Sequence, residues 1–415
     1  MIISQIFRSG ARWSVLLLSI FFPISIALGN LLLGTLLICG LLGYSAATWG
    51  ILKSHPVARA AGMLFVALLL GCTYGEASAT DAAVMIGKYA DLAFIPLLLA
   101  VFKDDLLRTR AENGFLLAML VTAILSWQVG LHILGASTCM WDGCSADNPS
   151  IFVNSIAHNS MMAFASFLFA LRAASAVSLL QKMLYIGGAL LTGSDVLFMV
   201  LGRTGYVAMG VLLTLFVWSV LQLKFEKSGH RIGWKQISGV ILLAVLAIWS
   251  AYQFSPRLHE RVDMVVSEAS DWRSQGRDDT STGLRLEFYT NSAKLVAQNL
   301  WVGVGTGGFA EAYRKLVEST TMLAARNPHN EYLHLTIQLG FVGLVLYLFY
   351  LLTQWKTARQ LPDAHSSVAA QGMVLTLLVS GMFNTPLMDH VEGLFFAYMS
   401  ALFFATYIPA EVKRA

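Results

Sequence analysis

The chain has 415 residues, of which 56% are hydrophobic and only 13% are Asp, Glu, Lys or Arg, with a net charge of +4. Soluble domains carry about 25% charged residues, so a chain of this composition could not hide its apolar surface from water. The composition excludes a soluble protein and predicts an integral membrane protein. The small net charge gives no reason to expect a nucleic-acid partner.

Apolar segments long enough to cross a bilayer as helices, about 20 residues each, recur from Trp13 nearly to the C-terminus. They are continuous rather than alternating, which excludes a transmembrane β-barrel. We therefore expect an all-α integral membrane protein with about twelve transmembrane helices. The expected spans are residues 13–28, 30–51, 60–74, 83–102, 114–136, 155–171, 183–201, 204–223, 237–254, 330–353, 367–384 and 391–408.

Lys and Arg residues concentrate in the tails and in the loops after even-numbered spans, which predicts that both termini are cytoplasmic. Residues 1–254 would then hold transmembrane helices 1–9, residues 255–329 a long periplasmic loop with amphipathic helices, and residues 330–415 helices 10–12 and a cytoplasmic tail. Nine Lys and Arg residues lie in the long loop, and long loops cross the membrane regardless of charge. These cations either solvate an amphipathic surface or grip an anionic substrate.

Cys139 and Cys144 share one of the short outward loops. An oxidising compartment on that side would favour a disulfide between them over two free thiols. Two thiolates are too few for a zinc site. We expect a disulfide here, no metal site and no cofactor.

Polar and ionisable residues at the outward ends of the expected helices are candidates for function, because such groups are costly inside a membrane. These residues are Lys88, Tyr89, His158, Asn159, Asp195, Arg203, His329, Asn330, Glu331, Asp389, His390 and Glu392. We expect them to converge near one leaflet.

An amphipathic stretch from Thr282 to Asn299 is followed by the glycine-rich segment Gly303-Val304-Gly305-Thr306-Gly307-Gly308-Phe309. This segment is not a P-loop, because no Gly-Lys-Ser or Gly-Lys-Thr ends it, and no strand precedes it. Two interpretations stay open. It is either a flexible turn between interfacial helices or a close backbone approach to a phosphate or a sugar.

The segment Asn327-Pro328-His329-Asn330-Glu331-Tyr332-Leu333 predicts a helix that Pro328 starts, with His329 in its first turn. The positive end of the helix dipole would keep this histidine neutral and therefore able to accept a proton. The alternative is a capping or packing histidine.

Taken together, the motifs resemble the O-antigen ligase and polymerase superfamily. They are Gly202-Arg203-Thr204-Gly205, then Arg285 ahead of an amphipathic helix, then the glycine-rich segment, then His329-Asn330-Glu331-Tyr332-Leu333. Their order and spacing match over most of residues 60–400, and the His-Asn-x-Tyr-Leu signature is the most specific part. The resemblance implies a GT-C-like membrane fold in the bacterial inner membrane, with the active site at the periplasmic face.

The resemblance further implies an O-antigen ligase, an inverting and metal-independent glycosyltransferase. Such an enzyme moves O-antigen polysaccharide from undecaprenyl pyrophosphate to a sugar hydroxyl of lipid A-core, which completes lipopolysaccharide. Its partners would be the lipid-linked polysaccharide, the lipid A-core acceptor and membrane lipids. The sequence contains no Asp-x-Asp motif, which fits a reaction without a metal.

The residues suit this chemistry. A sugar hydroxyl needs a base, for which His329 is the candidate, and the leaving pyrophosphate needs cations, for which Arg203 and Arg285 are the candidates. Further candidates for substrate binding are Lys88, Tyr89, Arg326, Asn330, Tyr332, Gly303 and Gly305.

Three other functions stay open. An O-antigen polymerase or a protein O-oligosaccharyltransferase of the same superfamily would use similar arginines and the same kind of histidine. A lipid-linked glycan transporter would also have about twelve helices, but its polar groups should gather at the midplane of the membrane. The outward position of the polar residues in this chain favours an enzyme.

Overall fold

The computed structural model describes residues 2–227, 239, 249, 252–253, 255–275, 280–319, 322 and 324–408. Within these residues the regular structure is helical, and the β-pairing is confined to one bridge between Ser145 and Asn148. The helices are α1 (Ile2–Phe21), α2 (Ile26–Ser54), α3 (Pro56–Gly71), α4 (Ala79–Lys88), α5 (Asp91–Val101), α6 (Asp105–Gly130), η1 (Ala136–Thr138), α7 (Ser155–Ser175), α8 (Leu179–Phe198), α9 (Arg203–Lys227), α11 (Pro256–Gln275), α12 (Ser281–Gln298), α13 (Phe309–Val317), α14 (Glu331–Ala358), α15 (Ala364–Phe383) and α16 (His390–Phe404). The expected all-α class is confirmed.

Short polar side chains begin many of these helices. Ser25, Asp104 and Ser178 each accept a hydrogen bond from a backbone N–H in the first turn of the helix that follows. Asp363 and Asp389 do the same for α15 and α16. The first N–H groups of a helix have no partner within the helix, so a capping oxygen removes part of the cost of burying them.

Six helical segments among the described residues are long and apolar enough to cross a membrane. They are α2, Ala79–Val101 (α4 with α5), α6, Arg203–Phe225 of α9, α14 and α15. The apolar helices α3 and α16 are shorter. The chain is therefore a multi-pass membrane protein. The number twelve stays a prediction, since the expected ninth span, residues 237–254, lies almost wholly outside the described residues.

The first expected span, residues 13–28, is wrong in its bounds. The helix there, α1, begins at Ile2 and ends at Phe21, and a separate helix begins at Ile26. Pro23 explains the break, because proline has no N–H and disfavours the helical conformation of the residue before it. Ser25 then caps α2.

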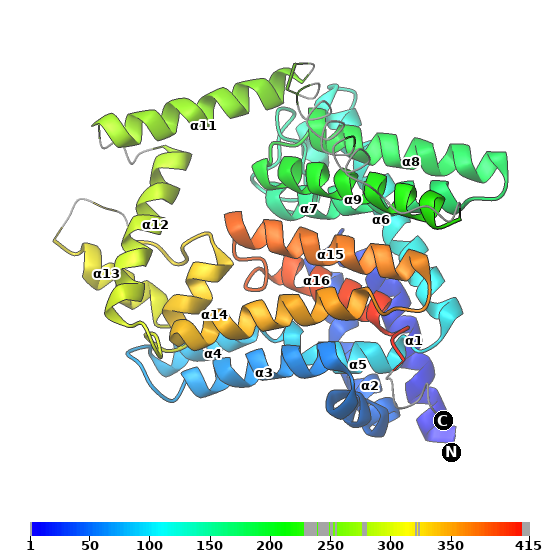
Figure 1. The fold of residues 1–415 in the computed structure, drawn as a ribbon, viewed down its shortest axis with the longest axis horizontal. Coiled ribbons are helices and arrows are strands. Elements are labelled where there is room, and N and C mark those ends of the chain that lie inside the picture. The colour runs from blue at the N-terminus through cyan, green and yellow to red at the C-terminus, as the bar shows by residue number, and fades with distance from the viewer. Residues whose placement is uncertain are drawn as a thin grey trace.

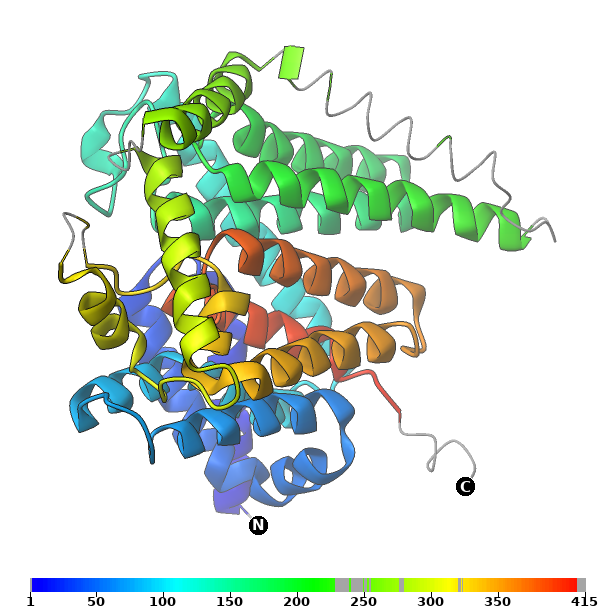
Figure 2. The same cartoon turned by 60° about the vertical axis from the view of Figure 1, so that its left-hand side comes forward.

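The helices form two packed groups and an arm. Helices α6 to α9 form one group, and α14 to α16 pack with α3 to α5 in the other (Figure 1). Helix α16 is buried from Val391 to Phe404, among α5, α6, α7 and α15. Helices α11, α12 and α13 lie together at one end of the molecule, and α12 packs against α14 (Figure 2).

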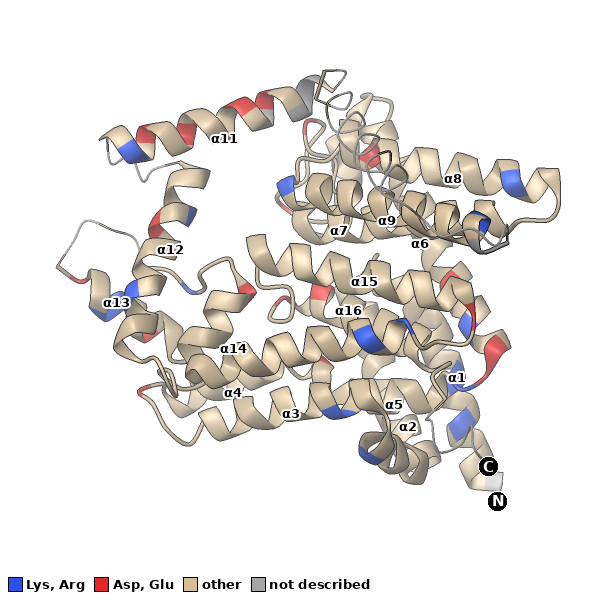
Figure 3. Ribbon diagram, viewed as in Figure 1, with Lys and Arg blue, Asp and Glu red and all other residues tan. Residues whose placement is uncertain are grey.

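Contacts between distant residues define the two ends of the bundle. At one end, Glu112 near the start of α6 accepts hydrogen bonds from Arg172 of α7, over 2.8 Å, and from His365 of α15, over 2.9 Å. At the other end, Tyr89 after α4 donates to Glu331 at the start of α14 over 2.6 Å. Acidic and basic residues are also dense on α11 to α13 at this second end (Figure 3).

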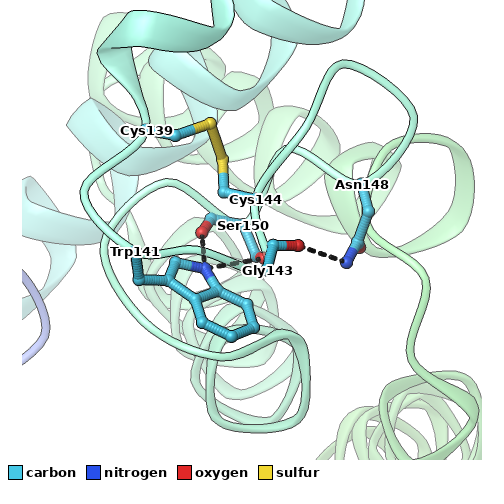
Figure 4. Close-up of a disulfide and its surroundings, with 6 residues drawn as sticks. All are labelled: Cys139, Trp141, Gly143, Cys144, Asn148 and Ser150. Atoms are coloured by element: carbon cyan, nitrogen blue, oxygen red, sulfur yellow. Dashed lines mark hydrogen bonds between the residues drawn. A yellow bond between two sulfur atoms is a disulfide. The ribbon is translucent and has the colours of Figure 1, made fainter.

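The structure joins Cys139 and Cys144 in a disulfide, within the loop that connects α6 to α7 (Figure 4). Beside it, the Trp141 indole N–H donates to the Ser150 carbonyl over 2.6 Å, and Asn148 donates to the Gly143 carbonyl over 3.4 Å (Figure 4). Because its polar groups are paired internally, this loop can act as a rigid support for what packs on it.

The charge pattern predicts which end of the bundle faces outward. Cysteine placed at Arg273, an exposed position on α11, should react with a membrane-impermeant maleimide added to intact cells. Cysteine at Lys356, an exposed position in the last turn of α14, should react only after permeabilisation. The control is the chain without the added cysteine, and labelling of the Lys356 position in intact cells would reverse the orientation.

Candidate functional site

Helix α12 carries one edge of the site. Thr280 caps it by accepting a hydrogen bond from the Gly283 N–H over 3.1 Å. Thr282, Arg285 and Tyr289 follow at helical spacing, so they share one side of the helix within about 10 Å along its axis. Helix α12 covers the stretch from Thr282 to Asn299 that was expected to be amphipathic, but Arg285 lies inside the helix rather than ahead of it.

Arg203, at the start of α9, lies against the first turn of α12. Its guanidinium donates to Thr282 Oγ1 over 2.9 Å and lies 3.5 Å from Glu268 of α11. Glu268 also accepts from the Thr282 N–H over 2.9 Å. Burial alone would raise the pKa of Glu268, but these Thr282 hydrogen bonds and the guanidinium hold it below its ordinary value. Arg203 therefore joins three helices, α9, α11 and α12.

The two glycines around Arg203 have a packing reason. A Cβ on Gly202 would lie 2.2 Å from the Asn159 amide nitrogen, and one on Gly205 would lie 2.6 Å from Asn159 Cβ. The turn itself is held by the Leu201 N–H, which donates to Asn148 Oδ1 over 2.9 Å. The disulfide-containing loop therefore supports the backbone just before Arg203.

Arg285 lies one turn further along α12 and is half-buried. Within the part of the chain that the structure describes, its guanidinium forms no ion pair. Its charge acts on two neighbours: it lowers the pKa of Tyr289 against the larger raising effect of burial, and it lowers that of His329. A half-buried guanidinium without a carboxylate partner is suited to bind an anionic ligand.

His329 lies just outside α14, and the prediction that Pro328 starts this helix is wrong. Asn330 is the N-cap, because its side chain accepts from the Leu333 N–H over 3.0 Å, and the helix begins at Glu331. His329 therefore precedes the cap, with a φ of 50° in the left-handed region. Asparagine is among the best N-cap residues, and its capping here prevails over the tendency of a proline to occupy the first helical position.

Four contacts hold His329 in this strained conformation. Its N–H donates to Asn327 Oδ1 over 2.9 Å, and its carbonyl accepts from the Tyr289 hydroxyl over 3.2 Å. Its ring stacks on Phe288 with centroids 6.1 Å apart, and Nδ1 lies 3.4 Å from Asn384 Oδ1. Phe288 and Tyr289 are neighbours on α12, so this helix links the histidine to the two arginines.

The environment of His329 favours its neutral form. Burial lowers the pKa of the imidazole, and the Arg285 guanidinium lowers it further, against a smaller opposite effect of the Asn384 hydrogen bond. The neutral ring was expected from the dipole of α14, but the causes in the structure are desolvation and Arg285. A neutral imidazole has one nitrogen that can accept a proton.

The expected substrate-binding side chains divide into two groups. Lys88 and Arg326 are exposed and available to a ligand. Tyr89 is fully buried, with its hydroxyl on a carboxyl group of α14. Asn330 donates to the Met382 carbonyl over 3.0 Å, and Tyr332 donates to the Leu378 carbonyl over 3.2 Å. The side chains of Tyr89, Asn330 and Tyr332 therefore hydrogen-bond to other parts of the protein.

Other polar residues expected at the outward helix ends form contacts of their own. His158 of α7 and Asp195 of α8 are buried and pair over 2.7 Å. Asp389 caps α16, and His390 lies in hydrogen-bond contact with Asn30 of α2. The His158–Asp195 pair joins α7 to α8 and the His390–Asn30 contact joins α16 to α2, whereas Asp389 caps its own helix.

The glycine-rich segment packs against other backbone. Gly303 and Gly305 have positive φ, and a Cβ on either would lie within 2.5 Å of a carbonyl oxygen of α14 or of the Tyr74 carbonyl. The N–H groups of residues 303–308 donate, in order, to the carbonyls of Asn299, Ile337, Gln338 and Gly71, to the Gln338 side chain, and to the Gly305 carbonyl. These donors are used within the protein, which favours a close backbone approach between chain segments over a phosphate cradle.

Two buried carboxyl groups and an asparagine complete this end of the bundle. Glu331 accepts from the Tyr89 hydroxyl and from a backbone N–H of the loop after α15, over 2.6 Å and 3.0 Å. Glu392 accepts from Asn384 over 2.9 Å. The sequence pointed to the two glutamates only as polar residues at helix ends. It gave no sign of Asn384, which is 55 residues from His329 along the chain.

The site thus contains the neutral imidazole of His329 beside the half-buried guanidinium of Arg285. A second guanidinium, that of Arg203 on α9, is bound to the first turn of α12. Among the described residues, no group of three or more His, Cys, Asp or Glu side chains could hold a metal ion. The arrangement can accept a proton and can bind an anion.

Comparison with known proteins gives the family. A model described as O-antigen ligase matches residues 188–348, the part of the chain that contains Arg203, Arg285 and His329. This match supports a place for the chain in the O-antigen ligase and polymerase superfamily. No curated protein matches the chain. The match indicates a glycosyltransferase-like enzyme, and the apolar helices make the chain a multi-pass membrane protein.

The charge of Arg285 should set the acid limit of activity. A histidine that acts as a base is inactivated by protonation, so the rate is lost as pH falls through the pKa of His329. Arg285→Gln removes a nearby positive charge, which makes the imidazolium less unfavourable and raises that pKa. The acid limb of the kcat/KM profile in a glycan transfer assay should therefore move to higher pH.

Lys294→Gln is the matched control, since Lys294 is a cation on the same helix that donates to Asn291 over 2.9 Å. It should leave the acid limb where it is. An acid limb that is the same in the wild-type protein and in Arg285→Gln would contradict the electrostatic link between Arg285 and His329.

Proposed function

We propose that this protein is an O-antigen ligase. It transfers O-antigen polysaccharide from undecaprenyl pyrophosphate to a sugar hydroxyl of lipid A-core at the periplasmic face of the bacterial inner membrane, with both termini in the cytoplasm. The proposal is supported by the family match and by the motif set, of which His329-Asn330-Glu331-Tyr332-Leu333 is the most specific part.

One observation carries the chemistry: α12 brings a neutral histidine and two arginines into one row. Tyr289 of α12 donates to the His329 carbonyl, Arg285 lies one turn before it, and Arg203 is bound to Thr282 one turn before that. A lipid-linked glycan has its reacting carbon next to its pyrophosphate, so one molecule can reach the base and the cations together.

The proposed reaction is a single displacement. The acceptor hydroxyl oxygen attacks the anomeric carbon of the donor, and its proton passes to His329 Nε2. The bond between the anomeric carbon and the pyrophosphate oxygen breaks, and undecaprenyl pyrophosphate leaves with the electron pair. The attack comes from the face opposite the leaving group, so the configuration of the anomeric carbon inverts.

The arginines stabilise the leaving group. Negative charge grows on the pyrophosphate as the bond breaks, and guanidinium groups are permanently charged and can bind phosphate oxygens in pairs. Arg285 and Arg203 take this role, with Lys88 and Arg326 as exposed cations that assist donor binding. Arginines in this place make the proposed transfer independent of a metal ion.

Substitutions of His329, Arg203 and Arg285 should impair different steps of the reaction. His329→Ala should retain donor binding but lose transfer by about 10²- to 10⁴-fold, the range for removal of a general base. Arg203→Lys and Arg285→Lys keep the charge but lose the planar guanidinium, so both should weaken donor affinity. The measurement is ligation with purified lipid-linked glycan and lipid A-core, together with donor binding and thermal melting.

Arg314→Lys is the matched control, because Arg314 lies on α13 and pairs with Glu311 on the exposed surface. It should behave as the wild-type protein. Near-normal ligation by well-folded His329→Ala would exclude the base assignment, and unchanged donor affinity in both site variants would exclude the pyrophosphate role. If the protein extends the lipid-linked glycan in an assay without lipid A-core, it is a polymerase instead.

A further inference from the structure

A series of hydrogen bonds leads from His329 into the interior of the bundle. Asn384 Oδ1 lies 3.4 Å from His329 Nδ1, and Asn384 Nδ2 donates to Glu392 Oε2 over 2.9 Å. The other carboxylate oxygen, Glu392 Oε1, accepts from Ser160 Oγ over 3.2 Å. Glu392 and Ser160 are fully buried, and Asn384 is only 9% exposed. The side chains behind the histidine are therefore closed off from solvent.

Hydrogen-bond chemistry gives this series a direction. In the structure the amide NH₂ of Asn384 faces the carboxyl group and donates to Glu392 Oε2. The amide oxygen then faces His329, and an amide oxygen can only accept. The hydrogen of a neutral imidazole must therefore lie on Nδ1, which leaves the lone pair on Nε2.

The backbone around this contact is fixed from both sides. The Tyr289 hydroxyl shares its one hydrogen between the carbonyls of His329 and Met382, each 3.2 Å away, and the Asn330 amide donates to the Met382 carbonyl. The segment before α14 is thus tied to the end of α15, where Asn384 lies. The left-handed conformation of His329 is strained, and these bonds offset the strain.

We propose that Asn384, oriented by Glu392, is a positioning residue that holds His329 in the Nδ1–H tautomer and so makes Nε2 the atom that accepts the proton of the acceptor hydroxyl. This inference rests on the proposed function, because it explains how His329 becomes the base. The arrangement follows the general logic of a base that is oriented by a third group.

The direct test is ¹⁵N NMR of the protein labelled in histidine, with the signal of His329 assigned by its loss in His329→Ala. The wild-type signal should show a protonated Nδ1 and an unprotonated Nε2 in the neutral form. An Nε2–H tautomer in the wild-type protein would overturn the proposal, and this measurement needs no change at Asn384.

The second test compares two substitutions of the same residue. Asn384→Leu removes the acceptor at similar volume, so the Nε2–H tautomer should become populated. Its kcat should fall by about tenfold or more. The decrease should not exceed that expected for loss of the whole base, about 10²- to 10⁴-fold. Its KM values should change little. Asn384→Asp keeps an oxygen towards Nδ1, while one proton shared between its carboxyl group and Glu392 replaces the amide hydrogen. It should recover most of the lost kcat, which a purely structural role would not explain.

Gln354→Leu is the matched control. Gln354 is a buried amide near the opposite end of α14 that accepts from Ser400 over 3.0 Å, so the change has the same chemistry away from the site. If Asn384→Leu keeps both its kcat and the Nδ1–H tautomer, the positioning role is wrong while the base assignment stands. Normal ligation by His329→Ala would instead remove the proposed function itself.

Discussion

Two carboxyl groups are buried in an apolar bundle, and the hydrogen bonds that compensate for their burial determine the structure around His329. Glu331 and Glu392 are fully buried, and neither pairs with a cation among the described residues. Removing such a group from water costs on the order of several kcal/mol unless hydrogen bonds replace its hydration. The donors come from three places: Tyr89 after α4, Ser160 in α7, and the loop after α15, through Asn384 and the Leu387 N–H. Satisfying the carboxyl groups thus fixes where that loop lies, and the loop in turn contacts His329.

Helix α12 meets this fixed framework from the other side. It is not among the helices long and apolar enough to cross a membrane, and its position depends on contacts at its start and its middle. Arg203 and Glu268 bind Thr282 at its start, and Tyr289 bonds to the backbone beside α14 and α15 further along. Three parts of the chain that are distant in sequence therefore share one row of side chains. A shift of α12 along its axis would separate Arg285 from the histidine, and the polar contacts of α12 oppose such a shift.

Local sequence signals predicted much of the fold and little of the site's internal support. The apolar lengths predicted the helical class, and the helix from Thr282 to Asn299 followed from its residue pattern. The predicted start of α14 was wrong, because the capping preference of Asn330 prevailed over the tendency of Pro328 to begin a helix. Asn384 could not be found, since its partner His329 is 55 residues away and its sequence surroundings resemble those of an ordinary turn. Contacts between residues close in the chain leave a pattern in the sequence, whereas contacts made by packing do not.

The glycine-rich segment shows why the proposed anion binding depends on side chains rather than on this stretch of backbone. Backbone N–H groups bind phosphate in many proteins when they point into open space, but those of residues 303–308 are used by α3, α14 and the segment itself. Gly340, which kinks α14 with a φ of 66°, receives this segment: the Phe341 N–H donates to the Leu300 carbonyl over 2.7 Å. The glycines thus allow α12 and α13 to join the bundle at close range. Because the N–H groups of residues 303–308 are used in that junction, side-chain cations remain to bind the proposed pyrophosphate. Arg285 can do so only if α12, which carries it, is held in position.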